Sequence, residues 1–152
     1  MEVVQKNEFY VVGISVRTTN ENQKAKEDIG KLWGQFMSED MFGIIQNRIS
    51  DAICAVYTNY ESDHTKPYDT ILGFQVTDLN SIPEGMVGVT ILKSNYQKFM
   101  AKGDLTKNAV VDKWMDIWNM DLNRTYTADF ELYGKKAEDP TNGEVDIYIA
   151  VK

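Results

Sequence analysis

The spacing of hydrophobic residues changes several times along the first half of the chain. β-Branched and aromatic residues are dense over 9–18, which predicts a strand. Over about 23–39 the apolar positions recur every three or four residues, as they do on one face of a helix. Two more strand-like runs, 52–61 and 68–77, are joined by turn-forming residues at 63–67. The first half is therefore predicted to be strand, helix, strand, strand.

A cluster of turn-forming residues at 79–85, with a proline and a glycine, interrupts the pattern near the midpoint of the chain. Beyond it the same order of elements returns. The sequence predicts a strand, a helix and two strands that cover about 86–99, 110–118, 125–133 and 145–151. Residues 55–60 also align with 128–133 without a gap, so that Tyr60 falls on Tyr133. The repeated order indicates a duplicated half-domain.

This order predicts an α+β fold in one domain over 1–152, built from two pseudo-symmetric strand-helix-strand-strand modules at about 1–78 and 79–152. Short turns between the strands favour a largely antiparallel sheet with its helices on one face. The opposite face must then be solvated, be packed on something else or form a groove.

The composition is that of a globular domain, because 43% of the 152 residues are hydrophobic and 26% are charged. The formal net charge is −7 and Lys and Arg form no run, which argues against direct binding to nucleic acid. An acidic chain favours cationic partners, although a charge of this size more often serves solubility. No stretch approaches the roughly 20 apolar residues of a membrane span, and the N-terminus has no secretory pattern. A cytoplasmic location without a membrane partner is therefore expected.

Motifs for metal ions, phosphate groups and nucleophilic catalysis are not evident. Cys54 is the single cysteine and lies in an apolar run, where a buried thiol is expected. His64 is the single histidine and lies in a predicted turn, where a solvated side chain is expected. With one residue of each kind, a metal site built from His and Cys is nearly excluded. No metal or cofactor is expected, so any enzymatic role would be that of a cofactor-free enzyme.

Alternation along the predicted strand 125–133 sends Phe130 to one side and Glu131 to the other. We expect the side of Phe130 to meet the helices. The alignment of the two halves then places Val56 and Tyr60 on the side of Glu131, which mixes apolar, aromatic and acidic groups. A carboxylate among aromatic rings suits an apolar cation. The residue pattern alone nevertheless favours an ordinary solvated carboxylate.

The tryptophans Trp33, Trp114 and Trp118 lie on the predicted helices beside other apolar residues, so core packing is their expected role. Aromatic residues on the predicted strands are more numerous than a core requires. Some of them are expected at a binding surface.

Several strings of residues resemble the GyrI-like family, which is also described as the effector-binding domain of AraC-type and BmrR-type regulators. The resemblance covers essentially the whole chain and rests on residues 10–13, 29–33, 56–61, 82–85, 96–99, 114–118 and 129–133. Members of that family have two strand-helix-strand-strand modules and bind hydrophobic, often cationic or aromatic molecules between the halves. The resemblance implies that Glu131 is the acid of the pocket. By position it also implies aromatic walls made by Trp33, Tyr60, Tyr68, Trp118 and Tyr148.

The resemblance implies a stand-alone domain that binds a small lipophilic molecule, cationic or aromatic, for sequestration or for transcription-linked sensing. In regulators of the family a helix-turn-helix region precedes this domain, whereas here the first predicted strand begins at residue 9. Two alternatives stay open. One is a hydrolase of electrophilic toxins that uses Glu131, and the other is an interaction protein with gyrase or a regulator as its partner.

Overall fold

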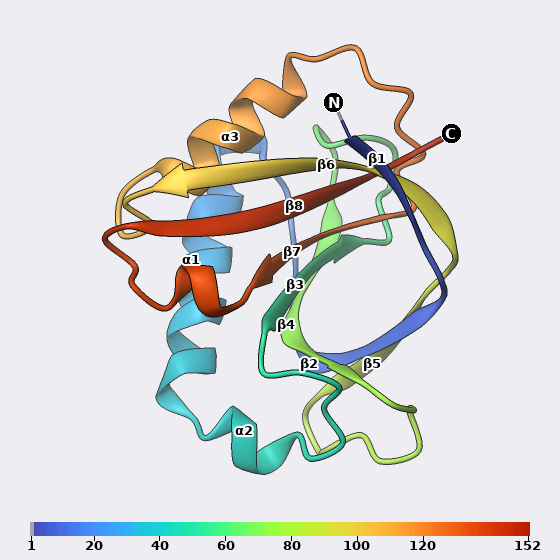
Figure 1. The fold of residues 1–152 in the computed structure, drawn as a ribbon, viewed down its shortest axis with the longest axis vertical. Coiled ribbons are helices and arrows are strands. Elements are labelled where there is room, and N and C mark those ends of the chain that lie inside the picture. The colour runs from blue at the N-terminus through green and yellow to red at the C-terminus, as the bar shows by residue number, and fades with distance from the viewer. Residues whose placement is uncertain (1) are drawn as a thin grey trace.

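The computed structural model describes residues 2–152 and contains one eight-stranded sheet with helices packed on it (Figure 1). The strands are β1 (Glu2–Lys6), β2 (Phe9–Thr18), β3 (Ile53–Thr58), β4 (Tyr68–Val76), β5 (Val87–Ile91), β6 (Ser94–Gly103), β7 (Ala128–Tyr133) and β8 (Gly143–Val151). The helices are α1 (Lys24–Ser38), α2 (Met41–Ile44) and α3 (Ala109–Trp118), with short 3-10 turns at Glu21–Gln23 and Lys135–Ala137.

The strand order β1-β6-β8-β7-β3-β4-β2-β5 is symmetric about its centre, and all neighbouring strands are antiparallel. From the central pair of β3 and β7, the sequence β4, β2, β5 on one side matches β8, β6, β1 on the other. The two edge strands are exchanged between the halves. β1, at the start of the first half, pairs with β6 of the second, and β5, at the start of the second half, pairs with β2 of the first. The predicted fold class is confirmed. The boundary suggested near residue 78 lies in the connection between β4 and β5.

The sheet is strongly curled (Figure 1), and a pair of glycines permits a close approach of two strands. Gly13 of β2 lies opposite Gly73 of β4 in the ladder. A Cβ atom on Gly13 would lie only 2.0 Å from the carbonyl oxygen of Leu72, and one on Gly73 would lie 1.9 Å from that of Val12. Only residues without a side chain fit at these two positions.

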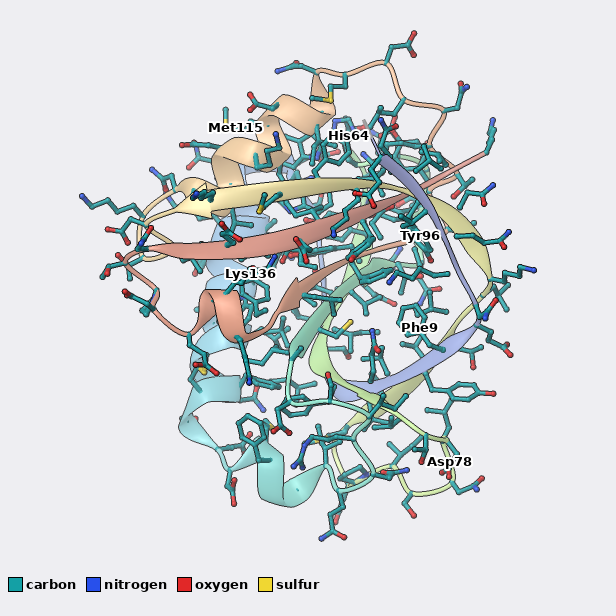
Figure 2. The ribbon with its side chains drawn as sticks, in the orientation of Figure 1. Phe9, His64, Asp78, Tyr96, Met115 and Lys136 are labelled. Carbon is teal, nitrogen blue, oxygen red and sulfur yellow. The ribbon has the colours of Figure 1, made fainter. Side chains whose placement is uncertain are left out.

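The concave face of the sheet encloses an aromatic core. Phe130 of β7 stacks on Tyr148 of β8 with ring centroids 4.7 Å apart. Phe9 and Tyr96, labelled in Figure 2, each contact Phe130 edge-on with centroids 5.1 Å apart. The face that the sequence left unassigned is thus buried by the curl of the sheet itself.

The helices α1 and α3 cover the opposite face, one over each half. Leu32 and Phe36 of α1 pack in a core with β2, β3 and β4, and Ile117 of α3 packs in a core with β6 and β8. These residues recur at the spacing that places them on one face of each helix. Tyr133 at the end of β7 contacts both cores, so the two helices flank the central seam between β3 and β7.

Two strand predictions were wrong in detail. The predicted strand at 86–99 is two strands, β5 and β6, because the chain turns at Leu92 and Lys93 without the Gly or Pro that would signal a turn. The edge strand β1 was not predicted, since only two of its five residues, Val3 and Val4, are apolar.

The predicted orientation of β7 was also wrong. Phe130 lies in the concave core with Cys54 and Val56, whereas Glu131 lies on the helix side with Tyr57. Both faces of β7 are buried, so apolarity could not show which one meets the helices. The alignment of 55–60 with 128–133 pairs residues of opposite faces and is therefore out of register by an odd number of positions.

Candidate functional site

A cavity of about 1040 Å³ opens between α1 and α3, over the seam where β3 and β7 meet. The sheet forms its floor with Tyr57, Glu131 and Tyr133. The helices form its walls, and their principal side chains are Ile29, Trp33 and Met37 from α1 and Val110, Val111, Trp114, Met115 and Trp118 from α3. This volume slightly exceeds the range of about 300–1,000 Å³ that is typical of small-molecule sites in proteins.

Glu131 is buried at the floor of this cavity, with only 1% of its surface exposed. Its Oε1 atom accepts hydrogen bonds from the hydroxyl groups of Tyr57 at 3.1 Å and Tyr133 at 2.9 Å. The indole Nε1 of Trp114 donates to Oε2. All three donors are neutral, and no Lys or Arg among residues 2–152 forms an ion pair with Glu131.

The sheet and one helix together position these donors. Ala55 lies opposite Glu131 in the ladder between β3 and β7, and its small side chain leaves room above the carboxylate. Tyr57 and Tyr133 are two residues further along their strands, on the same face. The three groups therefore approach Glu131 from β3, β7 and α3.

Burial raises the pKa of Glu131 above its ordinary value, and the hydrogen bonds from Trp114, Tyr133 and Tyr57 partly oppose this rise. The same burial, with the charge of Glu131 as the next cause, raises the pKa of Tyr57 and Tyr133 well above the ordinary tyrosine value. Both phenols therefore stay protonated and remain donors. The site holds a desolvated carboxylate that a positive charge would stabilise.

The aromatic rings that line the cavity near Glu131 contact one another. Trp33 contacts Tyr133 edge-on with centroids 4.9 Å apart, and Tyr57 contacts Trp114 at 5.4 Å. Trp114 in turn contacts Trp118 at 6.5 Å. Rings in this arrangement present faces and edges to the cavity, and their faces attract cations.

A second buried acid, Asp129, lies two residues before Glu131 on the same strand and is fully buried. It pairs with Arg124 at 2.7 Å and accepts a hydrogen bond from the Tyr60 hydroxyl at 2.6 Å. The backbone N–H of Ala150 donates to its other oxygen at 2.8 Å. Asp129 is thus neutralised within the protein, whereas Glu131 is not.

Five of the six residues that the sequence suggested for the pocket line this cavity, namely Glu131, Tyr60, Trp33, Tyr68 and Trp118. Tyr148 is the exception. It lies in the concave core, on the other face of the sheet from the cavity. The expectation that Tyr148 forms part of the pocket wall was wrong. Alternation on β8 puts Ile147 and Ile149, not Tyr148, on the side of the helices.

The expectation for His64 was also wrong. Its ring stacks on Trp118 with centroids 5.4 Å apart and planes 3° from parallel, and it lines the cavity. Burial, and then the charge of Arg124, lower the pKa of His64, so it is neutral at pH 7. The fold brings this loop over the end of α3, which the local sequence does not reveal.

Sequence reasoning placed Tyr133 on the side of Glu131, but it missed Tyr57 and Trp114 as donors and Arg124 as the partner of Asp129. Tyr57 was placed on the wrong face by the misregistered alignment, and Trp114 was assigned to the core. Arg124 precedes β7 in an irregular segment, so no periodic pattern marked it. Strand alternation does place Tyr133 on the side of Glu131, and this was a usable signal.

Over residues 2–152 no three His, Cys, Asp or Glu side chains are grouped to hold a metal ion. None of the helices in that range is long and apolar enough to cross a membrane.

Comparison with known proteins defines the class of protein. The model of a family of integron-associated effector-binding proteins, Cass2, matches residues 2–151. The chain belongs to this family, and the resemblance to GyrI-like effector-binding domains that the sequence suggested is confirmed.

Individual relatives agree with this assignment. An integron cassette protein of Vibrio cholerae, VCH_CASS2, has 32% identity and a TM-score of 0.76, over 99% of this chain and 95% of that one. YobU of Bacillus subtilis, named provisionally as a transcriptional regulator, is 32% identical over 92% of this chain and 90% of its own. SAV2435, whose structure was solved with bound tetraphenylphosphonium, shares the fold with a TM-score of 0.80 at 18% identity, over 99% of this chain and 93% of that one. The chain is thus an effector-binding domain related to a transcriptional regulator.

Proposed function

We propose that this domain binds a lipophilic organic cation in the cavity between α1 and α3. Glu131 supplies the opposite charge, and the rings of Trp33, Tyr57 and Trp114 enclose the apolar surface of the ligand. The observation that supports this most strongly is the state of Glu131. It is a buried carboxylate held only by neutral donors, and such a group gains stability from any cation that can reach it.

The shape of the site favours binding of a range of ligands over selectivity for one of them. Its walls are aromatic and methionine side chains, which adapt to ligands of different outline. The net charge of −7 adds a weak attraction for cations at longer range. Tetraphenylphosphonium, the ligand bound to SAV2435, is a cation of this kind and is a suitable first probe.

Binding agrees better with the hydrogen bonds of Glu131 than hydrolysis does. A carboxylate offers about four acceptor positions, and three are occupied by Tyr57, Tyr133 and Trp114. Little capacity is left to take a proton from an attacking water molecule. The biological role we propose is sensing, in keeping with the provisional name of YobU, or sequestration, which needs the same site.

The test uses two ions of nearly the same shape and opposite charge, tetraphenylphosphonium and tetraphenylborate, titrated by calorimetry at pH 7.5. We expect the cation to bind at least about tenfold more tightly than the anion, because the only unpaired charge at the floor of the cavity is negative. Equal affinities would contradict the role of Glu131 as a counter-charge.

The variant Glu131→Gln should weaken binding of the cation by about tenfold or more, since a hydrogen bond or ion pair to a charged group contributes roughly 1.5–3 kcal/mol. Asp112→Asn is the matched control, because Asp112 is an exposed carboxylate at the edge of the same cavity. Solvent screens its charge, so its loss should change the affinity by less than about twofold. Similar losses in the two variants would show that general acidity, and not Glu131, attracts the cation.

A further inference from the structure

The cavity has a second polar group that the proposed cation site does not use. Arg124 lines the cavity with 4% of its side chain exposed, and its Nη2 donates to Asp129. Its Nε and Nη1 atoms are buried and donate to no acceptor within residues 2–152. Buried donors are nearly always paired in proteins. Arg124 therefore lacks an acceptor that a bound molecule could supply.

The side chains around Arg124 are arranged as in a binding site and not as in a close-packed core. The guanidinium lies 4.3 Å from the centre of the Tyr126 ring, and Tyr126 contacts Tyr60 with ring centroids 5.6 Å apart. His64, stacked on Trp118, closes the same end of the cavity, and its buried Nδ1 also lacks a partner among the described residues. Access to Arg124 at this end is thus set by side chains from a loop and from the end of a helix.

Two residues at this end have a backbone conformation that side chains disfavour. Tyr126 has a φ of 54°, and Asn59, which precedes Tyr60, has a φ of 51°. A tyrosine in this left-handed region costs about 1 kcal/mol or more, and such residues concentrate at binding sites. The left-handed turns bring Tyr60 and Tyr126 around the pair of Arg124 and Asp129.

The charges of the cavity determine which chemical groups of a ligand can lie next to Glu131 and next to Arg124. Arg124 and Asp129 neutralise each other, which leaves Glu131 as the buried charge of the cavity without an ion-pair partner. The other charged side chains of the lining, Lys26, Lys107 and Asp112, are exposed to solvent. A ligand with one positive charge balances the site, whereas an anionic group near Arg124 would also lie near Asp129. The group best suited to Arg124 is therefore a neutral acceptor. Asp129, which holds Arg124, and Glu131 are two residues apart on one face of β7, so their Cα atoms are about 7 Å apart. We take this spacing as the separation of the cation from the acceptor.

We propose that the cavity is bipolar, and that its ligands are lipophilic cations with a neutral hydrogen-bond acceptor, such as a carbonyl oxygen, about 7 Å from the charge. The cation lies at Glu131 and the acceptor lies at Arg124. This inference rests on the proposed function and narrows its ligand class. A cation without an acceptor leaves the Arg124 donors unpaired and forgoes part of the available affinity.

The test compares 5-oxohexyltriphenylphosphonium with hexyltriphenylphosphonium, which differ by a carbonyl group in place of one CH2 group, with the carbonyl oxygen six bonds from phosphorus. In a purely apolar cavity the ketone would bind about tenfold more weakly, because its oxygen would lose its hydration without a partner. With Arg124 as the partner we expect the ketone to bind at least as tightly as the hexyl compound. If the ketone binds about tenfold more weakly than the hexyl compound, only the bipolar site is overturned. If neither compound binds, the proposed function itself fails.

The double variant Arg124→Met with Asp129→Asn removes both charges of the pair together, so that no buried charge is left alone. We expect its affinity for the hexyl compound to stay within about twofold, and the ketone to lose about fivefold or more relative to it. A smaller relative loss overturns the proposal. If the variant does not fold, the NMR chemical shift of the Arg124 Nε–H proton in the unmodified protein is measured instead. A downfield shift with the ketone alone supports the bipolar site. Equal shifts with both compounds contradict it.

Discussion

At the scale of the residue, the behaviour of Glu131 depends on a balance between burial and three hydrogen bonds. Burial raises its pKa above the ordinary value of 4.5, and Trp114, Tyr133 and Tyr57 oppose that rise. Only the ionised carboxylate attracts a cation. Affinity for tetraphenylphosphonium should therefore fall as the pH drops through the raised pKa of Glu131 and be constant above it.

The variant Tyr133→Phe should move this pH dependence. It removes one donor from the carboxylate, so the pKa of Glu131 rises further and the midpoint of cation binding moves to higher pH. The measurement is the dissociation constant of tetraphenylphosphonium from pH 5 to 8.5. Tyr60→Phe is the control, since its hydroxyl donates to Asp129 and its loss should leave the midpoint in place. Equal shifts in both variants would argue that the hydroxyl groups act on the fold and not on Glu131.

The sequence could suggest Glu131 but not its partners. The family resemblance pointed to this residue and to four wall residues that do line the cavity, Trp33, Tyr60, Tyr68 and Trp118. The hydrogen bonds from Tyr57 and Trp114 come from elements 74 and 17 residues away in the chain. Contacts of this kind depend on the register of β3 against β7 and on where α3 packs on the sheet. Local sequence patterns reveal neither.

At the scale of the element, most helices and strands were predictable because their hydrophobic periods are clear. The period of α1 and the β-branched run of β2 agree with the structure almost to the residue. The face that each strand presents was not predictable, since the curl of the sheet buries both sides of β7. The close approach of β2 and β4 was not predictable either, since it involves two glycines, Gly13 and Gly73, that are 60 residues apart.

The contact between these glycines can be tested by a single methyl group. In Gly13→Ala the added Cβ atom would meet the Leu72 carbonyl oxygen at 2.0 Å, so the two strands must separate. We expect the free energy of unfolding in urea to fall by about 3 kcal/mol, the upper range for overpacking. Gly34→Ala on α1 is the control, because nothing lies within 4 Å of its Cβ position. There the methyl group should stabilise the helix by about 0.5–1 kcal/mol, and a similar loss in both variants would contradict the close-contact explanation.

At the scale of the whole molecule, the pseudo-symmetric halves create the site that neither half contains alone. β3 and β7 meet at the centre of the sheet, and α1 and α3 stand on either side of that seam. The floor combines Tyr57 from the first half with Glu131 and Tyr133 from the second. The duplicated element order was visible in the sequence and indicated two pseudo-symmetric modules, whereas the expectation of a pocket between them came from the family resemblance.

The symmetry of the fold is not repeated in the chemistry of the site. The residue opposite Glu131 in the central ladder is Ala55, so the acid occurs in one half only. The cavity therefore has one buried carboxylate without an ion-pair partner, displaced toward β7 and α3, and one cation should neutralise it. This arrangement predicts a stoichiometry of one cation per chain.

The position of a bound cation tests this account most directly. Tetraphenylarsonium has nearly the shape of the phosphonium ion, and its arsenic atom gives an anomalous diffraction signal that marks the centre of charge in a crystal of the complex. We predict one anomalous peak per chain, in the cavity between Trp33 and Trp114, within about 6 Å of their ring centres and on the side of the Glu131 carboxylate. A peak outside this cavity, or bound ligand whose arsenic lies away from Glu131, would contradict the proposal that Glu131 is the counter-charge.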